Sequence, residues 1–110
     1  MATQSAAQPG AARTDPVRVD PKHYKVEFEN EKVRVLRIRY GSHEKSVMHG
    51  HPDGVMVCLT GFRGKFTYLD GRTEERSAKA GETLFMAGEQ HLPENLGDTP
   101  LEIILVEMKG

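Results

Sequence analysis

The sequence contains a single cysteine, so nothing cross-links the chain covalently. Cys58 is the only thiol among 110 residues, and no internal disulfide can form. A lone thiol is typical of a reducing compartment, and we expect a cytoplasmic protein. Residues two apart along a strand share a face, which groups Met56, Cys58 and Thr60 and favours Cys58 as a buried packing residue rather than a ligand or redox group.

An excess of charge of one sign and long apolar runs are also lacking. The chain carries 15 Lys and Arg against 16 Asp and Glu, which gives a net charge of −1. No basic stripe is present that would neutralise a row of phosphates. No apolar stretch approaches the roughly 20 residues that span a bilayer. We therefore expect neither a nucleic acid nor a membrane as a partner.

The composition divides the chain into a tail and one small domain. Residues 1–15 are rich in Ala, Gln, Ser and Thr and lack the continuous apolar centre of a secretory signal, so they are expected to form a disordered N-terminal tail. Residues 16–110 have the length and composition of one domain with a modest core.

That domain alternates between short strand-like segments and turn residues, without a helical period. Residues 24–28 alternate apolar and charged side chains, as in a half-buried strand, and residues 55–60 are almost wholly apolar, as in a strand covered on both faces. Asp70-Gly71 predicts a tight hairpin. So many short strands predict an all-β sandwich or barrel, because closure removes exposed sheet edges. The expected strands cover residues 24–28, 33–40, 46–51, 55–60, 62–68, 72–79, 83–86, 91–95 and 101–108.

Three histidines stand at positions that suit a metal site. His49 and His51 are two residues apart, so an extended strand presents both imidazoles on one face. His91 lies on a distant strand and would supply a third imidazole to the same ion.

Two stretches of the sequence resemble the two signatures of the cupin superfamily. Residues 44–61 (EKSVMHGHPDGVMVCLTG) resemble the first signature, and residues 81–95 (GETLFMAGEQHLPEN) resemble the second. The second keeps the family's glycine at Gly81, its histidine at His91 and its asparagine at Asn95.

This resemblance covers about residues 24–108 and implies a small RmlC-like domain. The implied fold is the cupin-like double-stranded β-helix, a jelly-roll barrel. The implied site holds one divalent transition metal on His49, His51 and His91.

The first signature departs from the family pattern in two ways. The usual glutamate after the second histidine is missing, since the nearby positions hold Gly54, Val55 and Met56, none of which carries a carboxylate. His43 stands where the family usually has a glycine, and histidine tolerates the left-handed backbone better than most residues. A site of three neutral imidazoles is one unit more positive than the four-ligand version.

Such a site predicts metal chemistry on a small molecule. Three protein ligands leave coordination positions open, and imidazole accepts Fe, Zn, Ni, Mn or Cu without a decisive preference. The resemblance suggests dioxygenase-type chemistry with iron, and isomerisation or hydrolysis with zinc or manganese. One fold hosts many functions, so a non-catalytic module that binds or senses a ligand is an alternative, and a metal-free dimeric scaffold is a third. Whether the protein is an enzyme stays open.

The polar neighbours of the histidines are expected to play smaller parts. Glu89 is predicted to be a loop residue with a solvated carboxylate, and Gln90 to face away from His91. Asn95 is expected to tie down a loop through its amide. His23 and His43 are expected to face solvent. The apolar core candidates near the site are Phe62, Phe66, Tyr68, Leu84 and Met86.

A homodimer is the expected assembly. The alternating N-terminal strand can pair or exchange across a two-fold axis, and two-fold dimers are the commonest oligomers.

Overall fold

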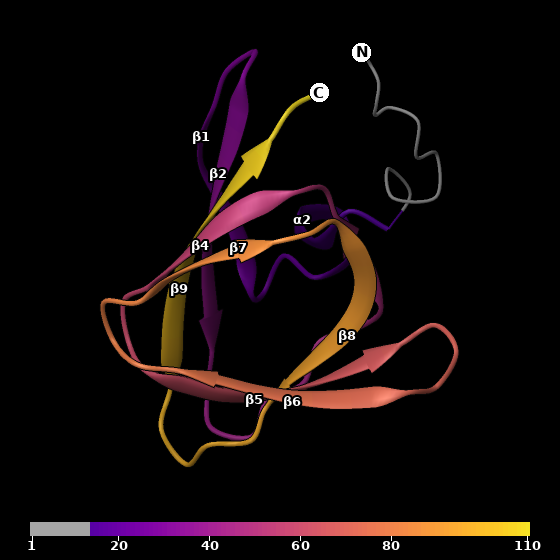
Figure 1. The fold of residues 1–110 in the computed structure, drawn as a ribbon, viewed down its shortest axis with the longest axis vertical. Helices are drawn as coiled ribbons and strands as arrows, with labels where there is room; N and C mark the ends of the chain where they lie inside the picture. Colours follow the sequence, from indigo (N-terminus) through magenta and orange to yellow (C-terminus); the bar gives the residue numbers. More distant parts are fainter. Residues whose placement is uncertain (1–13) are drawn as a thin grey trace.

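The computed structural model describes residues 14–110 and consists mainly of two facing β-sheets (Figure 1). The predicted tail, residues 1–15, lies outside the described residues except for Thr14 and Asp15. Within the described part, no helical segment has the length and apolar character needed to cross a bilayer. The elements in chain order are α2 (Pro16–Val19), β1 (Tyr24–Glu29), β2 (Val33–Tyr40), β3 (His49–His51), β4 (Gly54–Cys58), β5 (Phe62–Tyr68), β6 (Thr73–Ala78), β7 (Thr83–Met86), β8 (Glu89–Asn95) and β9 (Leu101–Met108).

The strands form two antiparallel sheets. The five-stranded sheet has the order β1-β2-β9-β4-β7, and the four-stranded sheet has the order β3-β8-β5-β6. Successive strands cross repeatedly from one sheet to the other, as in a double-stranded β-helix. The predicted all-β jelly-roll fold is confirmed, and β3 and β8 place two distant parts of the chain side by side.

The core between the sheets follows from the period-two pattern of the longest strands. Leu36, Ile38 and Tyr40 of β2 are buried, while the arginines between them point outward. In β9, Leu101, Ile103 and Leu105 are buried by the same alternation. Among the predicted core residues, Phe66, Met86 and Cys58 are buried and Phe62 packs against the core, whereas Tyr68 is only half-buried and Leu84 is exposed.

Two local features depart from the sequence expectations. Residues 16–19 form a short helix that no periodicity indicated, because Asp15 caps it by accepting a hydrogen bond from the Val17 amide. In β1, the register shifts between Val26 and Phe28, which places Phe28 beside Val35 on the outer face with 56% of its surface exposed. The β1 strand is therefore less buried than the predicted half-buried strand. The homodimer that was expected to form through this strand stays a prediction.

Two turns form where their residues suggested. The β5–β6 hairpin turns at Gly71, whose φ is 87°, whereas Asp70 does not take the positive φ that a two-residue turn would give it. The Asp70 carboxylate instead accepts a hydrogen bond from the Arg72 amide. His43 has a φ of 60°, so the family glycine position is left-handed here too and the turn accommodates the histidine.

Gly54 lies where β4 meets the backbone of β9. A Cβ atom added there would lie 2.6 Å from the Val106 carbonyl oxygen and 3.2 Å from a methyl group of Leu105. The backbone cannot yield as a flexible side chain would, so only glycine fits. Position 54 is one of those that correspond to the family glutamate, and it has no room for a side chain.

We expect the substitution Gly54→Ala to destabilise the fold by about 2 kcal/mol, in the range measured for overpacked cores. The free energy of unfolding in urea measures the loss. Gly61→Ala is the matched control, because its Cβ would meet its nearest atom, the Ala78 carbonyl oxygen, at 3.3 Å. Equal losses for the two variants would contradict the assigned contact.

Candidate metal centre

The three predicted histidines lie together inside the molecule. His49 and His51 come from β3 and His91 from β8, and the register pairs His49 directly with His91. The ring centroids are 4.8 Å apart for His49 and His51, 5.1 Å for His49 and His91, and 5.2 Å for His51 and His91. None of the three is more than 5% exposed. One nitrogen from each ring lies within 4.8 Å of the others.

Each ring is held by a hydrogen bond at its Nδ1 atom. The acceptor is the Val47 carbonyl for His49, at 2.9 Å. For His51 it is the Glu107 carboxylate and for His91 the Glu89 carboxylate, both at 2.6 Å. Because these oxygens only accept, each Nδ1 carries the hydrogen and each Nε2 keeps a free lone pair.

The environment of the His49 Nε2 atom tests whether a metal ion fits this site. Among the described residues, it is the one buried side-chain nitrogen or oxygen without a hydrogen-bond partner. Leaving such an atom unsatisfied is costly, and a divalent metal bound by the neighbouring rings would satisfy it. The residues therefore fit a metal ion.

Electrostatics keeps at least two of the rings neutral. Burial, reinforced by the neighbouring His51 and His91, lowers the pKa of His49 to about 2. Burial also lowers the pKa of His91, although its hydrogen bond to Glu89 works in the opposite direction. A nitrogen that binds a metal must be unprotonated. His49 and His91 already meet this condition at neutral pH, so a cation would not have to displace a proton from either ring.

The three rings would have to approach one another slightly to hold one ion. Two nitrogens that share an ion through bonds of about 2.1 Å can lie no more than about 4.2 Å apart. The nitrogens here lie within 4.8 Å of one another, so the widest pair would have to come closer. Three ligands would leave at least one coordination position open, and the imidazole set accepts several divalent transition metals.

Two of the rings are backed by carboxylates that are themselves paired with arginines. Glu107, 2% exposed, accepts from Arg34 through its other oxygen at 2.9 Å. Glu89 lies 3.4 Å from Arg76. The hydrogen bond from His91 and the charge of Arg76 lower the pKa of Glu89 despite its partial burial. The lowered pKa keeps Glu89 in the charged form that favours a donating imidazole.

The third ring is backed by a buried polar network. Ser46 Oγ lies 3.3 Å from His49 Nδ1 and donates to Asp20 at 2.5 Å. Asp20 also accepts from His23 Nδ1 at 2.7 Å, and His23 Nε2 lies 2.9 Å from Glu44. A carboxylate therefore lies two hydrogen bonds behind His49.

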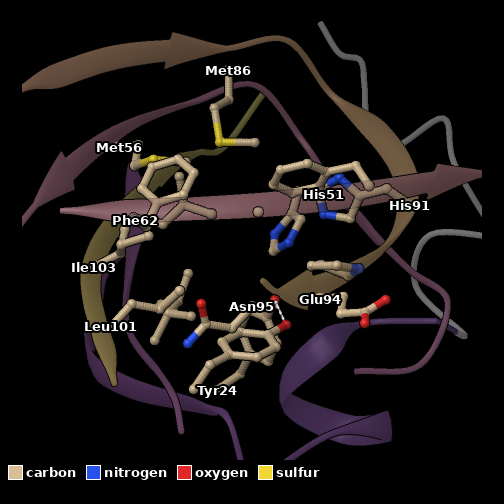
Figure 2. A pocket seen from close by; sticks show the side chains of 16 residues that line it. Tyr24, His51, Met56, Phe62, Met86, His91, Glu94, Asn95, Leu101 and Ile103 are labelled. Carbon is tan, nitrogen blue, oxygen red and sulfur yellow. Dashed lines mark hydrogen bonds between the residues drawn. The ribbon is translucent and has the colours of Figure 1, made fainter. Parts of the chain in front are cut away.

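A mostly apolar cavity of about 50 Å³ opens beside the histidines (Figure 2). His51, His91 and Tyr24 are among its lining residues, and the Tyr24 and His51 ring centroids are 5.8 Å apart. Tyr40 also lines the cavity, and its hydroxyl lies 2.6 Å from that of Tyr24. Burial and the Tyr40 hydroxyl raise the pKa of Tyr24 well above its usual value. The apolar lining comes from Ile38, Met56, Phe62, Phe66, Met86, Pro93, Leu101, Ile103 and Leu105.

The polar groups that line this cavity are bonded mainly to one another. The Tyr24 and Tyr40 hydroxyls share a hydrogen bond in which either oxygen can be the donor. Asn95 is saturated, since it donates to Gly41 and Thr99 and accepts from Gly97.

The expectations for the surrounding residues have mixed outcomes. The structural role of Asn95 is confirmed, Cys58 is buried, and His43 is exposed and bonded to Asp98. The expectation for Glu89 is wrong, because β8 begins at this residue, which puts Glu89 and His91 on one face. The expectation for His23 is also wrong: it is 5% exposed and stacks on Tyr40.

Glu107 is the site residue that the sequence reasoning missed. It follows Leu101, Ile103 and Leu105 in the inward series of β9, so the period of two points it into the core. An acidic residue in an inward position requires a partner, and that signal was available in the sequence.

Comparison with known proteins identifies the fold. No family model and no curated protein matches the chain. Among solved structures, a cupin domain from Bordetella pertussis Tohama I superposes with a TM-score of 0.72 at 24% identity, covering 79% of this chain and 92% of that one. The chain has the cupin fold. An RmlC-like cupin family protein from Methanocaldococcus jannaschii, with a double-stranded β-helix, gives a TM-score of 0.61 at 21% identity, covering 82% and 84%.

A third cupin-like structure agrees with these two. It is a conserved protein with a double-stranded β-helix domain from Klebsiella pneumoniae, with a TM-score of 0.62 at 20% identity, covering 79% of this chain and 76% of that one. At these identities the likeness establishes the cupin fold alone, and the chemistry must be argued from the residues.

We expect the metal-free protein to lose stability as the pH falls below 6.5. An unfolded histidine binds a proton with a pKa of about 6.5, whereas the folded pKa of His49 is about 2. Protons therefore favour the unfolded chain, and His49 alone removes about 1 kcal/mol between pH 6.5 and 5.5. Urea unfolding at the two pH values measures the change. The variant His49→Gln should show a smaller change, and an identical one would contradict the assignment.

Proposed function

We propose that this cupin domain binds one divalent transition metal on His49, His51 and His91 and acts on a small molecule in the adjoining cavity. The observation that carries the proposal is the unpartnered Nε2 atom of His49, buried among rings whose Nδ1 atoms are all committed elsewhere. Iron, zinc, nickel, manganese and copper all suit these ligands. The leading reaction classes are dioxygenase-type and isomerase-type chemistry.

When bound, the metal would supply a Lewis acid with open positions for a substrate oxygen. The protein contributes the surroundings. The apolar lining excludes water and strengthens electrostatic interactions within the cavity. The paired hydroxyls of Tyr24 and Tyr40 give the cavity a polar edge that can hydrogen-bond a ligand. The cavity therefore suits a small molecule with an oxygen ligand for the metal, an apolar body and a hydroxyl or carbonyl group, and small phenolic or dicarbonyl compounds meet this description.

A non-catalytic module that binds or senses a small ligand is the alternative. The saturated Asn95 and the raised pKa of Tyr24 favour it, because neither is ready to exchange a proton at neutral pH. A metal-free dimeric scaffold is a further alternative, and the missing glutamate of the first signature is the observation that supports it. The cytoplasmic location stays a prediction that rests on the lone cysteine.

Metal analysis of untagged protein, purified without a chelator, tests the metal directly. We expect about one equivalent of metal per chain. His51→Ala should remove most of it, because a ligand is lost, while His43→Ala should leave the content unchanged, because His43 is exposed and pairs with Asp98. Equal losses in the two variants would mean that the wrong imidazoles have been assigned. A wild-type protein without metal, even after incubation with each candidate ion, would favour the scaffold.

Turnover separates the enzyme from the binding module. The metal-loaded protein is mixed with small phenolic and dicarbonyl compounds, while dissolved oxygen and product formation are followed. Oxygen consumption indicates a dioxygenase, and conversion without oxygen loss indicates an isomerase or hydrolase. His51→Ala is the inactive control. Ligand binding without conversion in the loaded wild type would support the sensing module instead.

A further inference from the structure

The segment that precedes β1 is attached to the strand that carries two of the candidate ligands. The Gly50 amide, between His49 and His51, donates to the Thr14 carbonyl at 3.1 Å. Pro16, the first residue of α2, is fully buried. Residues 14–16 thus form part of the packing around the site, although the sequence placed residues 14 and 15 in a tail.

Asp15 is joined to His51 through two intervening side chains. Its two carboxylate oxygens accept from the two terminal nitrogens of Arg34, at 2.7 and 2.8 Å. Arg34 also donates from Nε to Glu107 Oε1 at 2.9 Å. The other oxygen of Glu107 accepts from His51 Nδ1 at 2.6 Å. A continuous series of charged hydrogen bonds therefore runs from Asp15 to the candidate ligand.

Arg34 needs both carboxylates to hold this arrangement. The bidentate contact with Asp15 fixes the plane of the guanidinium group. The Nε–H bond lies in the same plane, so its direction is fixed too, and this holds the Glu107 oxygen that accepts from it. Asp15 also balances the positive charge of Arg34. Without it, the guanidinium would withdraw charge from Glu107 alone, and Glu107 would be a weaker acceptor for His51. Burial works to raise the pKa of Asp15, but Arg34 outweighs burial and leaves that pKa below its usual value.

From these contacts we propose that Asp15 is a positioning residue for the metal centre, acting on His51 through Arg34 and Glu107. The effect on metal binding rests on the proposed function. The effect on the orientation of His51 does not, because it can be measured in the metal-free protein. It also means that a domain begun at residue 16 would lack part of its site.

The variant Asp15→Asn tests this role. Asparagine is as good a helix N-cap as aspartate, so the hydrogen bond with the Val17 amide can persist while the charge opposite Arg34 is lost. Asp70→Asn is the matched control, since Asp70 also accepts from the amide two residues ahead and also faces an arginine, at the tip of the β5–β6 hairpin. Asp15→Glu restores the charge and serves as the rescue variant.

Two measurements are made on the full chain. The first is the dissociation constant for zinc, by competition with a chelating dye. We expect Asp15→Asn to weaken zinc binding by about threefold to tenfold. Loss of a residue that hydrogen-bonds a metal ligand directly typically costs about tenfold or more in affinity, and Asp15 acts through two further side chains. Asp15→Glu should recover part of this loss, and Asp70→Asn should bind as the wild type does. The second is the NMR signal of the His51 ring in metal-free protein, which should shift in Asp15→Asn while that of His91 stays in place.

The outcomes separate this inference from the proposed function. If the wild type binds no zinc, the proposed function fails, and the His51 signal still decides the role of Asp15. Equal shifts of His51 and His91, or a loss of affinity that follows only the loss of thermal stability, would overturn the positioning role. Wild-type zinc affinity together with an unmoved His51 signal in Asp15→Asn would overturn it too.

Discussion

The candidate site depends on the hydrogen bonds at the Nδ1 atoms of its three histidines. A neutral imidazole has one donor and one acceptor nitrogen, and the partner of one nitrogen decides the state of the other. A backbone carbonyl fixes His49, while Glu107 and Glu89 fix His51 and His91. With these acceptors in place, the lone pairs face one another in the core. Without them, the rings could turn and satisfy their nitrogens elsewhere, and the site would become ordinary packing.

The same acceptors bear on the missing glutamate of the first cupin signature. Glu107 and Glu89 each lie one hydrogen bond behind a ring, and Asp20 lies two behind the third. These carboxylates bring negative charge close to a bound cation without occupying its coordination positions. A three-imidazole site of this kind can stabilise a divalent ion electrostatically while keeping more positions open than a four-ligand site does.

The sequence predicted most of the strands and the grouping of the three histidines, because both follow from a period of two and from turn residues. It did not predict what distant pairing determines. Glu89 belongs to β8 because that strand continues until it faces His51. His23 is buried because Glu44 and Asp20 bind both of its ring nitrogens. The helix α2 has four residues, too few for any periodicity, and it is held by Asp15 instead.

The close approach of Gly54 to β9 limits how this protein can change during evolution. Three positions correspond to the family glutamate. Gly54 has no room for a side chain, and Val55 points to the opposite face from the buried Met56. Of the three, only Met56 lines the cavity. A carboxylate ligand introduced within this part of the first signature would therefore have to replace a core methionine, so that coordination would be gained at the expense of packing.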